Sequence, residues 1–270
     1  MAKYSKVVAL FATIGWLAFT FSAYSGFSFW YAGFAFFLWL ALGSLNYNQK
    51  SSLWLLRNKW VTFLKFYWLL LIFSILTDLV VFQWMLDVWS YPHYNSFDDW
   101  GRLYLIIYPF GGLAILEFVF FLNSIFKERL TFMQKRRNKF HRFIDKFDNI
   151  LLAVVFLAPA TFFLNVWSPS ALASFIISGL LIWGVVASIK LAYHIRHGVH
   201  YVATLVAAFA MSVFLHEIPN VAVFEWKYNE APFLNQHILG VPLYIIFGWY
   251  ILVLIVLRFW IYFVQKKEQN

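Results

Sequence analysis

The sequence contains no cysteine and few charged residues, and each shortage excludes a class of protein. Without cysteine, the 270-residue chain forms no disulfide bond and has no thiol for catalysis or metal binding. Asp, Glu, Lys and Arg supply only 12% of the residues, whereas a soluble domain carries about 25%. A chain with so few charges cannot cover a folded core with polar groups, so a soluble globular protein is excluded.

Apolar residues take the place of the missing charges. Hydrophobic residues make up 63% of the chain and aromatic residues 23%, and the mean hydropathy is +0.70. Lipid requires no polar cover, and a helix satisfies its own backbone hydrogen bonds there. We therefore predict an all-α, multi-pass integral membrane protein.

Eight segments are apolar enough to cross a bilayer as helices, which takes about 20 residues each. They are residues 7–24, 27–46, 60–86, 102–126, 150–167, 171–193, 201–224 and 238–263. The first follows Lys3 and Lys6 and also has features of a signal peptide. We interpret it as a retained helix, because a second apolar run follows almost at once.

The positive charges predict the orientation. The net charge is +9, and 19 of the 21 Lys and Arg residues fall on the side of the predicted bundle that carries the N-terminus. Only Arg102 and Lys227 fall on the other side, together with five acids. Basic residues favour cytoplasmic loops, so we predict cytoplasmic N- and C-termini, in the cell or inner membrane, and no nucleic-acid partner.

The most basic segment, residues 127–149, separates two halves of the chain. It holds eight Lys or Arg, three acids and four interleaved Phe residues. The simpler interpretation is a cytoplasmic linker that also fixes the orientation. The alternative is a helix that lies on the inner leaflet and binds anionic lipids.

Short motifs recur in the two halves, residues 1–126 and 150–270. The tripeptide WSY (89–91) matches WKY (226–228) at an offset of 137, and Asp78 matches Glu217 at an offset of 139. Four helices in each half would make the repeats parallel, related by an axis along the membrane normal. Two such halves facing each other would enclose a central cavity.

Three acids, Asp78, Glu117 and Glu217, fall within predicted spans. A charged residue at the centre of a membrane helix costs about 2.5–3.5 kcal/mol, so such residues usually face the bundle interior. An uncharged carboxylic acid in an apolar cavity is a proton donor, and we expect all three acids to share that cavity. His216 would tune Glu217 or relay its proton. The alternative is that the acids hydrogen bond neighbouring helices.

Aromatic rings follow Asp78 and Glu217 where the third and seventh helices leave the membrane. Trp89, Tyr91, Trp226 and Tyr228 have a default role as interfacial anchors. At the rim of a cavity they would also pack a polyene and stabilise a carbocation, by about 2 kcal/mol when water is absent.

A cluster of histidines, His194, His197 and His200, is the remaining candidate site. Three histidines at this spacing suit a metal, but we favour a polar loop at the inner face. The sequence has no nucleotide-binding or hydrolase motif. We therefore predict neither a metal nor another cofactor.

The order of these motifs resembles the membrane carotenoid cyclases of the heterodimeric or fused lycopene-cyclase type, and the related carotenoid hydratases. The first unit is Asp78, then VWSY (88–91) and AILEFVFF (114–121). The second is Glu217, then EWKY (225–228) and VPLYIIFGW (241–249). The resemblance implies a substrate-binding set that comprises Trp89, Tyr91, Glu225, Trp226, Tyr228, Asn229, Pro242 and Trp249.

The chain also departs from the family pattern, in which each unit has Pro-x-Glu-Glu after the aromatic loop. The paired acids read Leu116 and Glu117 in the first unit, and Tyr244 and Ile245 in the second. One acid of four remains at these positions, which puts a lycopene-cyclase activity in doubt.

The resemblance implies a membrane enzyme that protonates the end of a polyene and then closes a ring or adds water. Glu217, Asp78 and Glu117 are the candidate donors or bases. Two other classes stay open: a non-catalytic polyene- or lipid-binding or accessory subunit, and a proton-coupled transporter. The sequence leaves the oligomeric state, homo- or hetero-oligomer, open.

Overall fold

The computed structural model describes residues 2–49, 51–125, 139–164, 167–194 and 198–265. Its elements are α1 (Ala2–Ala23), α2 (Trp30–Leu45), η1 (Tyr47–Gln49), α3 (Ser52–Asn58), α4 (Trp60–Ser74), η2 (Ile75–Met85), β1 (Trp89–Ser90), α5 (Phe97–Arg102), η3 (Leu103–Ile107), α6 (Tyr108–Ile125), α7 (Lys139–Leu157), η4 (Ala158–Leu164), α8 (Pro169–His194), α9 (Gly198–Val223), β2 (Lys227–Tyr228), β3 (His237–Ile238), β4 (Val241–Pro242), α10 (Leu243–Trp260) and η5 (Ile261–Gln265). The elements η1 and η4 are 3₁₀ helices, whereas η2, η3 and η5 are π-helices.

Long apolar helices dominate the fold, as predicted. Within the described ranges, seven helical stretches are long and apolar enough to cross a membrane. They are Ser5–Ala23, Trp60–Met85, Phe97–Ile125, Arg142–Leu164, Pro169–Ala192, Tyr201–Val223 and Leu243–Val264. The all-α, integral membrane class is therefore confirmed. The predicted span 27–46 corresponds to α2, whose 16 residues measure about 24 Å, somewhat less than a hydrocarbon core of about 30 Å.

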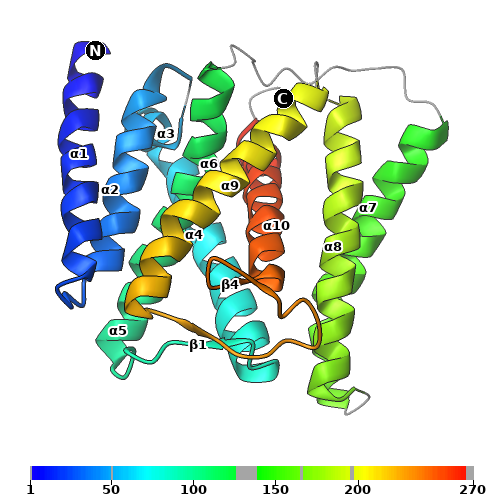
Figure 1. Ribbon diagram of the computed structural model, residues 1–270. Coiled ribbons are helices and arrows are strands. Elements are labelled where there is room, and N and C mark those ends of the chain that lie inside the picture. Colours follow the sequence, from blue (N-terminus) through cyan, green and yellow to red (C-terminus); the bar gives the residue numbers. More distant parts are fainter. Residues whose placement is uncertain (1, 50, 126–138, 165–166, 195–197, 266–270) are drawn as a thin grey trace.

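The two ends of the described chain lie at the same end of the bundle. Figure 1 shows the start of α1 and the end of α10 at the top, together with α3 and the adjoining ends of α6 and α7. The loops that carry β1 and β4, and the short helix α5, lie at the opposite end. The aromatic motifs thus gather at the end of the bundle away from the chain ends.

The helices near the centre are buried, and those at the margin are exposed. Leu113, Ala114 and Ile115 of α6 are 0–1% exposed, and α6 packs against α2, α4, α9 and α10. In contrast, α1 packs mainly against α2 and leaves Phe11 and Phe21 open at its surface. Lipid replaces water around such rings, so their exposure carries no hydrophobic cost.

Two π-helical stretches flank the region of the aromatic motifs. The first, η2, continues α4, and the second, η3, leads into α6. In a π-helix the backbone bonds run from residue i to i+5, and such turns are rare and frequently occur at functional sites. Asp78 lies in η2, so the wide turn surrounds one of the predicted acids.

The two aromatic motifs pair with each other. The strands β1 and β2 are antiparallel, with Trp89 opposite Tyr228 and Ser90 opposite Lys227. Each motif follows a helix end and a residue with positive φ, Asp87 (47°) in one case and Phe224 (54°) in the other. These two residues are separated by the same offset of 137 as the motifs. The division into parallel four-helix repeats stays a prediction, which this local similarity favours.

The basic segment 127–149 lies partly outside the described residues. Residues 139–149 are described, and they continue directly into the apolar part of α7. The fourth-from-last span therefore begins near Arg142, earlier than the predicted residue 150. Because helix α7 is unbroken there, residues 139–149 do not form a separate helix.

A charged cluster joins α7, α8 and α10 at this end of the bundle. Asp148 is fully buried and accepts hydrogen bonds from Trp183 Nε1 (2.9 Å), Lys190 Nζ (2.7 Å) and Arg258 Nη1 (2.9 Å). The two cations are about a third exposed, at 28% for Lys190 and 32% for Arg258. Asp148 therefore links three helices through one buried carboxylate.

Replacing this acid tests the link. Asp148→Asn should lower the unfolding temperature in detergent, because it removes the charge that pairs with both cations. We expect a loss near the lower end of about 1–3 kcal/mol, since water partly screens the exposed cations. The exposed Asp98→Asn is the matched control, and equal unfolding temperatures for the two variants would contradict the assignment.

Candidate functional site

A cavity of about 500 Å³ lies among η2, α6, α8, α9 and α10, a size usual for small-molecule sites. Its walls are mainly apolar, with residues such as Leu70, Ile115, Leu180 and Leu252. Of the predicted site residues, those that line it are Asp78, Trp89, Tyr91, His216, Glu217, Trp226, Tyr228 and Trp249. The structure thus brings Asp78 and Glu217, from different halves, to one chamber.

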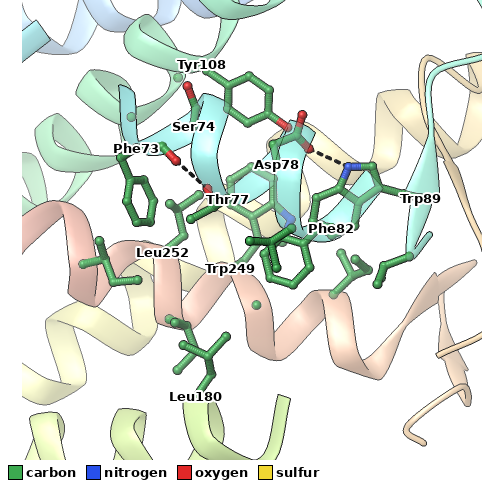
Figure 2. A pocket seen from close by; sticks show the side chains of 18 of the residues that line it. Phe73, Ser74, Thr77, Asp78, Phe82, Trp89, Tyr108, Leu180, Trp249 and Leu252 are labelled. Atoms are coloured by element: carbon green, nitrogen blue, oxygen red, sulfur yellow. Dashed lines mark hydrogen bonds between the residues drawn. The ribbon is translucent and has the colours of Figure 1, made fainter. Parts of the chain in front are cut away.

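Asp78 is held by hydrogen-bond donors on both of its oxygens. Trp89 Nε1 donates to Oδ1 at 2.6 Å, and Gln83 Nε2 donates to Oδ2 at 2.7 Å. Tyr104 Oη adds a bond to Oδ2 at 2.6 Å. Figure 2 shows the Trp89 bond and the phenol of Tyr108 turned toward the same carboxyl.

The π-helix explains how Gln83 reaches Asp78. The two residues are five positions apart, a spacing that would place them on different sides of an α-helix. In a π-helix the backbone bonds join residues i and i+5, so two residues five positions apart lie on the same side of the helix. The wide turn of η2 therefore supplies one donor of the Asp78 site.

Glu217 has a corresponding arrangement. Trp249 Nε1 donates to Oε1 at 2.6 Å, and Tyr228 Oη donates to Oε2. Tyr228 Oη itself accepts from Trp226 Nε1 at 2.5 Å, so its own hydrogen is directed to Glu217. Burial, together with the neighbouring acid, raises the pKa of Tyr228 well above its usual value, so the phenol keeps this proton.

The turn of the backbone after α9 brings the WKY motif (226–228) next to Glu217. Helix α9 ends at Val223, and Phe224 takes a positive φ that turns the chain back. The backbone N–H of Trp226 then donates to Asn220 Oδ1 at 2.9 Å. The side chain of Asn220 therefore fixes the point at which the aromatic loop begins.

The donor sets give the two acids a common chemistry. In each site an indole N–H and a phenol O–H meet the carboxyl, and hydrogen bonds to a charged acceptor are about twice as strong as neutral ones. These donors stabilise the carboxylate that remains after a proton leaves. The sequence alone offered no such stabilising partner.

His216 is bonded to Tyr31. The distance between His216 Nδ1 and Tyr31 Oη is 2.7 Å, and the imidazole packs against Trp249 with ring centroids 4.8 Å apart and planes tilted by 33°. We predicted that His216 tunes Glu217 or relays its proton. Among the described contacts of His216 there is no direct hydrogen bond to Glu217. The connection to Glu217 runs through Trp249, which touches both.

Glu117 lies elsewhere, and the expectation that all three acids share the cavity is wrong for this residue. It is fully buried, and it accepts hydrogen bonds from Asn46 Nδ2 (2.9 Å), the backbone N–H of Ser52 (2.7 Å) and Ser52 Oγ (2.5 Å). The physical reason is that α6 turns this side chain toward α2 and the start of α3. For Glu117 the alternative prediction, a hydrogen bond to neighbouring helices, is correct.

Three other predicted residues, Glu225, Asn229 and Pro242, do not line the cavity. Glu225 accepts from Trp30 Nε1 (2.8 Å) and Tyr94 Oη (2.5 Å), and burial and the charge of Glu225 raise the pKa of Tyr94. Asn229 Nδ2 donates to Asp87 Oδ1 at 2.9 Å, and Pro242 lies opposite His237 in the β3–β4 pair. These residues stabilise the loops around the cavity and do not line the cavity itself.

The structure adds residues that the sequence reasoning missed. Tyr31, Gln83, Tyr104 and Tyr108 complete the polar contacts of the cavity region. One signal could have found two of them, because Trp100, Tyr104 and Tyr108 recur at a spacing of four. Their rings stack in sequence, at 6.1 Å and then 5.6 Å, as the same face of a helix requires.

The histidine cluster cannot be described in full. His197 and the side chains of His194 and His200 lie outside the described residues. In the part of the chain that is described, no three His, Asp or Glu residues are grouped so as to hold a metal ion.

The cavity reaches the lipid-facing surface. Leu76 of η2, Phe156 of α7 and Phe247 of α10 line it, and they are also 55%, 41% and 43% exposed. All three lie within the membrane-spanning stretches. The apolar wall of the cavity therefore extends to the surface of the membrane-spanning stretches.

No protein-family model, curated protein or solved structure matches the chain. The resemblance to carotenoid cyclases and hydratases therefore stays a prediction from the motifs.

Removing the Glu117 carboxyl tests its assignment to the fold. Glu117→Ala leaves the two buried donors of Ser52 without this acceptor and removes one of the two acceptors of Asn46 Nδ2, which should lower the stability by about 1–3 kcal/mol. Thermal unfolding in detergent measures this, with the exposed Glu230→Ala as the control. An unchanged unfolding temperature would return Glu117 to the list of candidate reactive groups.

Proposed function

We propose that the protein is an integral membrane enzyme of carotenoid or isoprenoid metabolism. It acts on a long apolar polyene in the cavity between its halves and begins the reaction by protonating a terminal double bond. Ring closure or addition of water then completes the reaction. The family resemblance of the motifs supplies the reaction class.

The observation that supports this proposal most strongly is the pair of hydrogen-bonded carboxyls, Asp78 and Glu217, that face one aromatic cavity. Protonation of an alkene requires an acid whose conjugate base is stabilised. The indole and phenol donors around each carboxyl provide that stabilisation. A binding protein for hydrocarbons would need the apolar walls alone.

The proton balance of the reaction uses both acids. One carboxyl gives its proton to the less substituted carbon of a terminal double bond; its O–H bond and the C=C π bond break, and a C–H bond and a tertiary carbocation form. A neighbouring double bond or a water molecule then attacks the cation. A proton leaves the ring carbon or the added water and passes to the carboxylate of the other acid. Proton exchange between the two acids through water then restores the starting state.

Aromatic rings line the space where the cation would form. Trp89, Tyr91, Trp226 and Trp249 all face the cavity, and the negative face of such a ring attracts a cation. The same rings exclude water from the reactive end. This arrangement favours cyclisation or controlled hydration over random quenching.

The membrane supplies the substrate in this proposal. A polyene dissolved in the bilayer enters at Leu76, Phe156 and Phe247. Both ends of the protein face the cytoplasm, and the basic segment 127–149 binds anionic lipids of the inner leaflet.

Heavy water tests the chemistry. Protein incubated with a linear carotenoid in deuterium oxide should place deuterium at a product carbon, which mass spectrometry detects. Asp78→Asn and Glu217→Gln should each reduce turnover about 100-fold or more, whereas Asp98→Asn, an exposed acid, should not. If pigment purifies with the protein but no deuterium enters it, the protein is a binder. Transport without chemical change would make it a transporter.

Cysteine labelling tests the orientation, because the natural chain has no cysteine to react. Asn48 lies in η1 next to α3, and α3 is at the end of the bundle with the chain ends (Figure 1). Glu230 follows β2, which pairs with β1 at the opposite end, and both side chains are exposed. In intact cells an impermeant maleimide should label Glu230→Cys but not Asn48→Cys, and lysed cells should label both. The reverse pattern would invert the orientation.

A further inference from the structure

One buried polar atom in the cavity has no protein partner. His216 is 1% exposed and lines the cavity, and its Nε2 makes no hydrogen bond. Its other nitrogen is occupied by Tyr31, and one face of the ring is covered by Trp249. Nε2 is therefore the polar atom of this cavity-lining side chain that is left without a partner among the described residues.

A buried polar group without a partner is costly, and in a native protein it calls for an explanation such as an ordered water or a bound group. Other polar groups of the cavity do not satisfy Nε2. Asp78 and Glu217 accept their bonds from indole, phenol and amide donors. Tyr228 is committed to Glu217 and Trp226. Among the described residues Nε2 therefore has no partner, and a molecule bound in the cavity can supply one.

We propose that the molecule bound in the cavity carries a hydroxyl group, and that this hydroxyl hydrogen bonds to His216 Nε2. The proposal rests on the proposed function and names its substrate class: an isoprenoid alcohol or hydroxylated polyene, rather than an unsubstituted hydrocarbon.

The chemistry of the site favours a hydroxyl over other oxygen groups. Tyr31 Oη either donates to His216 Nδ1 or accepts from it, so Nε2 either carries a hydrogen or lacks one. A hydroxyl both donates and accepts, and it matches each tautomer. A carbonyl matches only one of them. A charged group would lie in an apolar cavity without a free counter-ion, at a high cost in free energy.

The other half of the chain offers no corresponding group. Thr77 precedes Asp78 as His216 precedes Glu217, and it also lines the cavity. Its hydroxyl donates to Phe73 O at 2.7 Å within its own helix (Figure 2). The hydroxyl of the ligand is thus expected beside Glu217, and the apolar end of the ligand beside Asp78.

Binding of a matched pair of probes tests the proposal without turnover. The probes are geranylgeraniol and the hydrocarbon with the same carbon skeleton but no hydroxyl. Quenching of the cavity tryptophans in lipid nanodiscs reports the Kd of each. The natural protein should bind the alcohol about three- to ten-fold more tightly, the usual value of one hydrogen bond.

Variants of His216 assign the preference to Nε2. His216→Phe keeps a ring against Trp249 and should abolish the preference for the alcohol, while its hydrocarbon affinity stays and shows that the cavity is intact. His216→Gln retains an amide near Nε2 and should restore part of the preference. Thr77→Val is the control at the matching position and should leave the preference unchanged.

Two results would overturn the proposal. Equal affinity of the natural protein for both probes means that Nε2 is satisfied by water. A preference that survives in His216→Phe means that another group binds the hydroxyl. A preference for the alcohol without any deuterium incorporation would refute the proposed enzyme and leave the assignment of His216 standing. Binding of neither probe would refute both.

Discussion

The fold depends on hydrogen bonds made where water is absent. In the bilayer core every polar group needs a partner from the protein, so each buried acid has drawn donors from several elements. Glu117 joins α6 to α2 and α3 through Asn46 and Ser52. Asp148 joins α7, α8 and α10. Since helices in lipid gain little from hydrophobic association, such polar contacts decide which faces meet.

The two acids that line the cavity meet the same need for hydrogen-bond partners. Asp78 and Glu217 are satisfied by donors just as Glu117 is, yet both also face an apolar space. The acids differ in their surroundings rather than in their hydrogen bonds. Asp78 and Glu217 lie beside aromatic rings that line the cavity, whereas Glu117 is enclosed by its partners.

Much of this could be predicted from the sequence, because it depends on patterns along the chain. Hydrophobic runs gave the spans, and the matched positions of Asp78 and Glu217 placed both in one cavity. Glu117 was misplaced because a single acid in an apolar helix has no periodic signal that tells which face it occupies. Tyr31 and Gln83 were missed for a similar reason. Tyr31 reaches His216 from a helix 185 residues away in sequence, and Gln83 reaches Asp78 only because η2 is a π-helix.

The antiparallel pairing of β1 with β2 has a consequence for how the chain can change. Trp89 lies opposite Tyr228, and each is bonded to the carboxyl of its own half. The β1–β2 pair therefore joins the two halves, and neither half forms the cavity by itself. An insertion between acid and motif in one half would shift the partner strand as well, so a viable lineage has to alter both spacings in step or keep both fixed.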